Sequence, residues 1–271
     1  MSDPVVFKER YGPTALVLGG SEGIGREFAE ELATRGLDLL LVARSPDALA
    51  QAATQIQARH GVRVSTRAHD LGAAGGERLA HELLASHDIG LLICNAGATH
   101  GVGRFLDEPL EKASRLVSLN CQVPLAFAHA ALARRRGRGA GVVVVSSMSA
   151  LAGSGLIAAY AAAKAFQVAL CEGLHWELRG AGLDVLCAVA GLTDTPAMRR
   201  SGLSFAAAAE RGYAPMSAAQ VARGALAQLG RTPVWYAVGE ETVASLRAMP
   251  REELTAAMSA ATAAMYGVSL A

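Results

Sequence analysis

Short apolar runs alternate with longer amphipathic segments along the first two-thirds of the chain. The apolar runs have the length of strands and lie at 14–19, 37–43, 62–68, 89–95, 141–147 and 183–190. The segments between them follow helical spacing, at 23–35, 46–60, 75–87, 111–136 and 157–180. Strands that are apolar along most of their length are typical of a sheet covered on both faces. The alternation therefore predicts an α/β fold: a doubly wound, Rossmann-like parallel sheet with helices on both faces.

The pattern changes after about residue 192. Here the sequence predicts a helix at 217–229, a last strand at 233–238 and a C-terminal helical extension over about 240–271. No internal repeat and no interdomain linker interrupts the chain, and 271 residues is an ordinary length for one α/β domain. We therefore expect a single domain over residues 1–271.

Composition narrows the possible partners. The net charge of +1 argues against a nucleic-acid-binding protein, which usually carries a strong basic excess. No apolar run reaches the roughly 20 residues that span a bilayer, and the first residues lack the apolar core of a signal peptide. The four cysteines form no CxxC pair and show no metal-ligand spacing, so we expect reduced thiols and no metal. We expect a cytoplasmic protein with no membrane partner.

A glycine-rich turn follows the first apolar run and leads directly into a helix. The residues assigned to it are Gly19, Ser21, Glu22, Gly23, Ile24 and Gly25. Glycines let the backbone approach a pyrophosphate, and the helix N-terminus supplies unpaired N–H groups and a positive dipole end. The spacing is GxxxGxG, which differs from the general GxGxxG fingerprint. The turn predicts a dinucleotide site; a tight turn with a purely structural role is the alternative.

The end of the second strand indicates which nicotinamide cofactor binds. An acid at that position holds the ribose 2′-hydroxyl of NAD(H), and an arginine accommodates the 2′-phosphate of NADP(H). Arg44 ends the strand, whereas Asp38 begins it, away from the carboxyl end where ligands bind. Arg44 therefore favours NADP(H). NAD(H) stays possible, because Glu22 in the glycine turn would repel additional negative charge.

Polar and small residues also follow the later strands. Asp70, with Leu71 beside it, closes the third strand, where the adenine would lie. Asn95, Ala96 and Gly97 close the fourth strand, and small residues there would let the chain pass under the nicotinamide ribose.

The candidate catalytic residues lie in the second half of the chain. Tyr160 and Lys164 are four residues apart on a predicted helix and so share a face. A free tyrosine has a pKa of about 10, and a nearby ammonium should lower it, which suits proton exchange with an alkoxide. Ser147 ends the preceding strand and can hydrogen-bond the substrate oxygen. Asn120 could hold a water next to Lys164 and so connect Tyr160 to solvent.

Together these motifs resemble the short-chain dehydrogenase/reductase family across at least residues 12–240. The matches are the glycine loop (Gly19, Gly23, Gly25), the adenine-site acid (Asp70), the NAG segment (Asn95, Ala96, Gly97), the catalytic set (Asn120, Ser147, Tyr160, Lys164) and a PGxxxT-like segment, in which Gly191 and Thr195 match and Thr193 lies between them. The resemblance implies that the last segment binds the cofactor and that Lys164 contacts the nicotinamide ribose. Leu18, Cys94 and Ala190 replace the family's usual Thr, Asn and Pro, outside the proton-transfer set.

The resemblance implies an enzyme that interconverts a ketone and a secondary alcohol by hydride transfer. The segments LGGSEGIG, SSMS and AAKAF and the C-terminal extension are similar to those of bacterial NADP-dependent 7β-hydroxysteroid dehydrogenases, which favours a bulky, apolar substrate. One alternative is a 3-ketoacyl-thioester reductase that docks an acidic carrier protein on RRRGRG at 134–139. Another is a non-catalytic NADP-binding sensor or scaffold.

Two further features follow from the resemblance. Residues 192–214 lie where the family carries a substrate-covering loop, and their small and apolar residues suit a mobile lid. The family is usually dimeric or tetrameric through the helices at 111–136 and 157–180, so we expect a homodimer or homotetramer. His100 and Arg104 are placed near the mouth of the site, where either could touch substrate, although a solvated role is the simpler interpretation.

Overall fold

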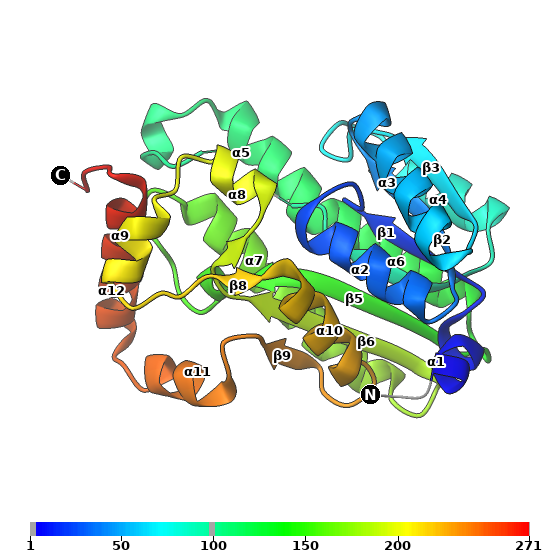
Figure 1. Ribbon diagram of the computed structural model, residues 1–271. Helices are drawn as coiled ribbons and strands as arrows, with labels where there is room; N and C mark the ends of the chain where they lie inside the picture. The colour runs from blue at the N-terminus through cyan, green and yellow to red at the C-terminus, as the bar shows by residue number, and fades with distance from the viewer. Residues whose placement is uncertain (1–3, 98–100, 271) are drawn as a thin grey trace.

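A computed structural model of the chain describes residues 4–97 and 101–270. Its main sheet is made of β1 (Thr14–Leu18), β2 (Asp38–Ala43), β3 (Val64–Ala68), β4 (Ile89–Cys94), β5 (Ala140–Ser147), β6 (Leu183–Ala190) and β9 (Val234–Tyr236). These seven strands are parallel and lie in the order β3-β2-β1-β4-β5-β6-β9 (Figure 1). The doubly wound parallel sheet predicted from the sequence is confirmed.

Helices cover both faces of the sheet and divide the core into two halves. The first face carries α2 (Gly23–Thr34), α3 (Pro46–His60) and α10 (Ala218–Gln228), and the second carries α4 (Gly76–Ser86), α6 (Val123–Arg134) and α7 (Ala158–Leu178). Phe28 anchors the first half and Phe127 the second, each fully buried. Burying an aromatic side chain of this size stabilises the fold by about 2–3 kcal/mol.

The long helix predicted at 111–136 is interrupted by a π-helical turn. The helix runs through α5 (Leu110–Val117), η2 (Ser118–Gln122) and α6. Asn120 lies in the π-helical turn, a distortion that often marks a functional position. The change of helical pitch there alters which side chains face inward, which regular 3.6-residue spacing does not reveal.

By length and composition alone, the helical stretch Leu110–Arg134 could cross a membrane. Half of its most apolar window is buried inside the protein. The buried side packs against α4 and against β4 and β5. The buried apolar residues of this stretch therefore belong to the core, as expected for a central helix of an α/β fold.

The two ends of the chain differ from the sequence-based expectation. An N-terminal helix, α1 (Pro4–Tyr11), was not predicted; it buries Phe7 and Tyr11, and the Tyr11 hydroxyl donates to Asp184 at 2.7 Å. The C-terminal extension is two helices, α11 (Glu240–Arg247) and α12 (Arg251–Tyr266). Pro250 separates them, because a proline cannot continue the hydrogen bonding of the first helix.

The segment predicted as a lid contains short elements that pack against the C-terminal extension. They are β7 (Thr193–Asp194), α8 (Pro196–Arg200) and α9 (Phe205–Glu210), followed by β8 (Met216–Ser217), which pairs with β7. The Ser204 N–H donates to the Met265 carbonyl at 2.8 Å and so joins α9 to α12. In Figure 1 α9 and α12 lie side by side at one end of the molecule, and α1 lies at the other.

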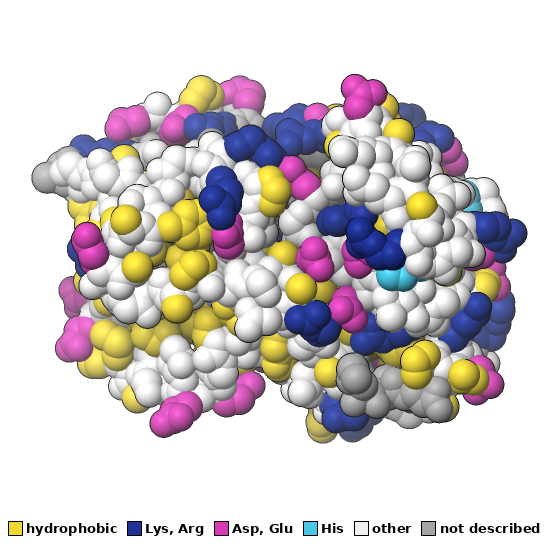
Figure 2. Space-filling model, viewed as in Figure 1, with side chains coloured by type: hydrophobic (Ala, Val, Ile, Leu, Met, Phe, Trp, Pro, Cys, Tyr) yellow, Lys and Arg dark blue, Asp and Glu magenta, His cyan; other side chains and the backbone are white. Residues whose placement is uncertain are grey.

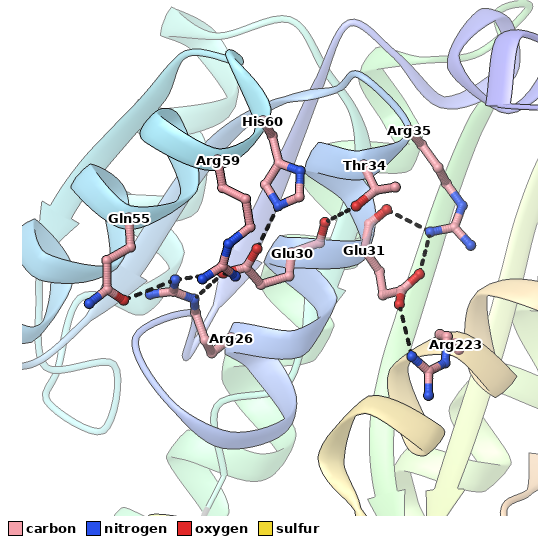
Figure 3. Close-up of polar contacts among 9 residues, drawn as sticks. All are labelled: Arg26, Glu30, Glu31, Thr34, Arg35, Gln55, Arg59, His60 and Arg223. Carbon is pink, nitrogen blue, oxygen red and sulfur yellow. Dashed lines mark hydrogen bonds and ion pairs between the residues drawn. The ribbon is translucent and has the colours of Figure 1, made fainter.

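A network of charged residues joins α2 to α3 on the first face (Figure 3). Glu30, 15% exposed, accepts from Arg26 at 2.6 Å, from Arg59 at 2.9 Å and lies 2.6 Å from His60 Nε2. Burial opposes ionisation of Glu30, but the bonds from Arg26 and His60 outweigh it and lower the pKa of this carboxyl. The network joins the C-terminal part of α3 to α2.

Candidate active site

The carboxyl ends of the strands surround a large cavity. The strand order reverses between β1 and β4, and in open α/β sheets ligands bind at such a switch point. A cavity of about 530 Å³ lies there. The predicted residues in its wall are Gly19, Ser21, Glu22, Gly23, Ile24, Arg44, Asp70, Leu71, Asn95, Ala96, Gly97, Ser147, Tyr160, Lys164, Gly191, Thr193 and Thr195. Gly25 and Asn120 lie behind this wall.

The glycine turn is packed too tightly for side chains. Gly19 has φ of +81°, and a Cβ there would lie 3.0 Å from the backbone of Ala96. A Cβ on Gly25 would lie 2.0 Å from the Gly19 carbonyl oxygen, so the start of α2 sits directly on the turn. The side-chain amide of Asn95 donates to the same oxygen at 3.2 Å. Asn95 thereby joins the end of β4 to the glycine turn.

The beginning of α2 is open toward a ligand. Its N-cap residue is Glu22, whose side chain makes no capping hydrogen bond. The first N–H groups of a helix have no partner within the helix and attract anions. Glu22 instead pairs with Arg200 of α8, with Arg200 Nη1 at 3.1 Å from Glu22 Oε2. Arg200 thus offsets the negative charge of Glu22, which from the sequence was expected to repel a further phosphate.

The end of the cavity next to β3 contains an ion pair that the sequence did not predict. Arg115 of α5 donates to Asp70 Oδ2 at 2.5 Å, and the Gly72 N–H donates to Oδ1 at 3.0 Å. The bond from Arg115, above all, lowers the pKa of Asp70, and Arg44 acts in the same direction. Arg44 is exposed in the cavity wall next to Ser45, which caps α3. Two arginines therefore flank Asp70.

Ser147 and Tyr160 face each other across the end of β5. Burial raises the pKa of Tyr160 to about 12, the Ser147 side chain acts against this rise, and Tyr266 adds to it. The expectation that the Lys164 ammonium lowers the pKa of Tyr160 is therefore wrong for this structure. The Lys164 Nζ lies 5.5 Å from the centre of the Tyr160 ring, and its hydrogen bonds go elsewhere. Tyr160 is consequently a neutral phenol at physiological pH.

Lys164 and Asn120 are both buried and meet next to Gly97. Burial lowers the pKa of Lys164 to about 8, and the nearby thiols of Cys187 and Cys121 oppose this. The Asn120 amide donates to the Leu116 carbonyl at 3.0 Å, and its Oδ1 is buried without a partner. A Cβ on Gly97 would lie 2.6 Å from Asn120 Oδ1 and 3.2 Å from Lys164 Nζ. Glycine is needed at 97 because a side chain would strike both groups.

Some predicted residues have bonds that restrict what they can offer a ligand. The Thr193 hydroxyl donates to the Gly191 carbonyl at 3.0 Å, and the Thr195 hydroxyl caps α8 by accepting from the Met198 N–H at 3.1 Å. Arg104 is exposed at the start of η1 (Phe105–Asp107), and His100 lies outside the described residues.

Six polar residues at the cavity were not assigned to the cofactor site from the sequence: Ser45, His69, Arg115, Ser146, Arg200 and Ser201. Arg115 and Arg200 reach the cavity from helices far along the chain and lie in no motif. His69 was adjacent to a predicted residue, Asp70, and the end of β3 was the signal that could have found it. The side chains of α8 could be recognised as part of the cavity wall only from the fold, which places α8 beside the glycine turn.

The cavity has the features that a nicotinamide dinucleotide requires. Gly19 and Gly23 of the glycine turn line the wall, α2 presents uncapped N–H groups, and Arg44 supplies a cation beside Asp70. At the opposite end, Lys164 and Tyr160 line the wall where a nicotinamide ribose would lie. The donor set fits the cofactor.

Comparison with known proteins gives several matches. The family described as short chain dehydrogenase matches residues 13–203. The 7beta-hydroxysteroid dehydrogenase of Clostridium sardiniense is 29% identical over 256 residues, 92% of this chain and 95% of that protein. The very-long-chain 3-oxoacyl-CoA reductase of Laccaria bicolor is 34% identical over 182 residues, 64% of this chain. That match spans only 52% of the reductase.

Solved structures give the same result. A 7beta-hydroxysteroid dehydrogenase superposes with a TM-score of 0.84 at 25% identity, over 93% of this chain and 98% of that one. A Sphingobium yanoikuyae short-chain dehydrogenase in complex with NADPH gives 0.73 at 31% identity, over 80% and 84%. A bulky-bulky ketone specific alcohol dehydrogenase from Comamonas testosteroni gives 0.74 at 29%, over 87% and 90%. With the family match extending over residues 13–203 of 271, the chain belongs to the short-chain dehydrogenase family.

Proposed function

We propose that the protein is an NADP(H)-dependent oxidoreductase that interconverts a ketone and a secondary alcohol, with a bulky, apolar, steroid-like or cyclic substrate. The observation that carries the proposal is the convergence of Ser147, Tyr160 and Lys164 on one wall of the cavity at the strand switch point. When bound, the cofactor supplies or accepts the hydride. A binding or scaffolding protein would have no need of this proton-handling set.

The chain's own residues manage the proton and orient the substrate. Tyr160, a neutral phenol at physiological pH, donates its proton to the oxygen of the reduced carbonyl. The Ser147 hydroxyl holds that oxygen by hydrogen bonding. Lys164 has three N–H donors, and two are used by the Val145 carbonyl at 3.0 Å and by the Gln167 side chain at 3.1 Å. One donor remains for the cofactor or for a water.

The cofactor preference rests on Arg44. We expect Arg44→Ala to lower kcat/KM with NADPH by about 10- to 100-fold, the loss of one charge-assisted contact, and to leave NADH within about twofold. Arg63→Ala is the matched control, because this exposed arginine pairs with Asp38 at the opposite end of β2. Steady-state kinetics with both cofactors measure the effect. An unchanged ratio would remove Arg44 from the proposal, and a wild-type preference for NADH would overturn it.

The substrate class is supported by the lid and the C-terminal extension. Met198 and Ser201 line the cavity, and the Tyr266 hydroxyl of α12 lies 3.8 Å from Met198 Sδ and 3.5 Å from Ser201 Oγ. Hydrophobic side chains gather over α9 and α12 on the left of the face in Figure 2. Flexible methionines suit apolar ligands of irregular shape. The related 7beta-hydroxysteroid dehydrogenases and the bulky-ketone dehydrogenase favour the same class.

A panel of carbonyl compounds tests the substrate class. NADPH oxidation would be followed with one-ring, two-ring and steroid ketones, a sugar ketone and an acetoacetyl thioester. We expect kcat/KM to rise with ring number, by roughly tenfold for each ring that is buried, since an added ring removes several CH₂ groups from water. A preference for the thioester or for the sugar ketone would contradict the proposal.

The second candidate is a 3-ketoacyl-thioester reductase, which the similarity to very-long-chain 3-oxoacyl-CoA reductases favours. The arginine cluster at 134–139 does not support carrier docking at the site. It follows α6 and precedes β5, so it lies at the amino ends of the strands, opposite the cavity. Arg135 is buried and donates to the Ile89 carbonyl at 2.9 Å, and Arg138 pairs with Asp88.

Three organisational features complete the proposal. Residues 192–214 act as the substrate lid within a single catalytic domain. A homodimer or homotetramer forms through α5, α6 and α7, which expose the apolar side chains of Val117, Leu125, Phe166 and Trp176. The protein works in the cytoplasm, a reducing compartment that suits its four free cysteines.

A further inference from the structure

Gln167 is a buried polar residue that the proposed chemistry has not yet used. It lies on α7 one turn after Lys164 and is 1% exposed. A glutamine is rarely buried this completely, because its amide loses its bonds to water unless the protein replaces them. Both ends of the Gln167 amide are bonded, and both partners belong to the candidate catalytic set.

The oxygen of Gln167 holds the Lys164 ammonium. Lys164 Nζ donates to Gln167 Oε1 at 3.1 Å, and an acceptor on the charged form favours that form. The other groups that act on this ammonium are the Val145 carbonyl at 3.0 Å, the thiols of Cys121 in η2 and Cys187 in β6, and the Tyr160 ring at 5.5 Å. In the part of the chain that the structure describes, Gln167 is the only side chain that accepts a hydrogen bond from Lys164 Nζ.

The nitrogen of Gln167 holds Asn120. Gln167 Nε2 donates to the Asn120 main-chain oxygen at 2.8 Å, inside the π-helical turn. The main-chain oxygen is thereby occupied, and the Asn120 Nδ2 is occupied by Leu116. The Oδ1 is left as the open acceptor of Asn120, next to Gly97 and on the same side as Lys164 Nζ. A water that joins Asn120 to Lys164 would therefore bind at Oδ1.

We propose that Gln167 is a positioning residue of the active site, which ties the Lys164 ammonium and the Asn120 turn into one rigid unit. The role in turnover rests on the proposed function. The positioning itself depends on this chain alone. The Gln167 amide sets the direction of the remaining N–H of Lys164, and it favours the charged form of the Lys164 side chain in a buried site. Gln167 would act through Lys164 and would not touch the substrate.

Two substitutions of nearly equal volume test the role without turnover. Gln167→Met removes the acceptor, and Gln167→Glu replaces it with a negative charge. The pH dependence of the free energy of unfolding, with Lys164→Met as the reference background, reports the Lys164 transition near pH 8. We expect it to move down by about one pH unit in Gln167→Met and up by about one unit or more in Gln167→Glu.

Val221→Ala is the control, since Val221 is fully buried in the other half of the core. It should lower stability without moving the transition. If Gln167→Met does not fold, Gln167→Asn takes its place: it keeps an amide but is one methylene shorter, so its oxygen is withdrawn from Lys164 Nζ and the same downward shift is expected. Shifts in the same direction for both variants, or no shift, would overturn the proposal.

Turnover gives the second readout. We expect Gln167→Met to lower kcat by roughly tenfold near neutral pH, with KM for the ketone little changed, because misplacing a catalytic group affects the chemical step. The alkaline limb of the kcat profile should move in opposite directions in the two variants. Inactivity of the wild-type protein on every carbonyl would reject the proposed function and leave the unfolding test valid. An active wild type with unchanged Gln167 variants would reject the positioning role alone.

Discussion

Tyr160→Phe is expected to lower kcat for ketone reduction by about 10²- to 10⁴-fold, the usual contribution of a positioned general acid. The substitution removes one oxygen and leaves the ring, so the packing of α7 and the affinity for NADPH should be retained. Stopped-flow or fluorescence titration measures that affinity, and steady-state kinetics measure kcat. Turnover within a few-fold of wild type, with the cofactor bound normally, would exclude Tyr160 as the acid.

Tyr11→Phe is the matched control for this substitution. Tyr11 is also a buried phenol, and its hydroxyl donates to Asp184 at the opposite end of the sheet. Its loss should lower stability by about 1 kcal/mol or more, because the Asp184 carboxylate loses a partner, and should leave kcat unchanged. The comparison separates a catalytic phenol from a structural one.

Lys164→Met is expected to reduce turnover by at least about 10²-fold and to weaken cofactor binding, since the remaining N–H donor is lost. It should also change how stability depends on pH. The pKa of Lys164 is about 8 when folded and 10.5 in the free side chain, so between these values the unfolded chain binds more protons. Wild-type stability therefore gains up to about 3 kcal/mol from Lys164 as pH rises from 8 to 10.5.

The difference between wild type and Lys164→Met isolates this gain, because buried tyrosines and thiols titrate in both proteins. Urea unfolding at several pH values without cofactor measures it. A difference that does not change with pH would mean that Lys164 is not held as a desolvated ammonium. The same measurement defines the reference for the Gln167 variants.

The residues predicted for the cofactor wall follow strands directly, and this is why the sequence located them. Gly19, Arg44 and Asn95 each come at the carboxyl end of a buried parallel strand, and the fold brings such ends to one edge. Recognising the strands was therefore enough to group these residues. Asn120 was placed on the correct helix, but not in its π-helical turn, since the distortion depends on packing against α7.

Partners that come from separate elements could not be predicted in the same way. Arg115 with Asp70, Arg200 with Glu22, and Gln167 with Asn120 all pair across distances in sequence that no spacing rule covers. The pKa of Tyr160 was expected to fall for the same reason: the neighbour at four residues was visible, and the burial that outweighs it was not. Local spacing identifies which groups are present, and tertiary packing determines their protonation.

The pairing of Glu22 with Arg200 has a consequence for the rate of product release. Both side chains are largely exposed, at 41% and 63%, and an exposed pair of this kind contributes about 0–1 kcal/mol and is screened by salt. This ion pair between α8 and the glycine turn is thus weak enough to open and close without a large energetic cost. If departure of the oxidised cofactor limits the cycle, the enzyme should run faster as ionic strength increases, until screening also weakens the hold of Arg44 on the 2′-phosphate. The turnover rate would then have an optimum in salt concentration. Salt would weaken both the Glu22–Arg200 pair and the contact of Arg44 with the 2′-phosphate, but the first change would speed turnover and the second would slow it.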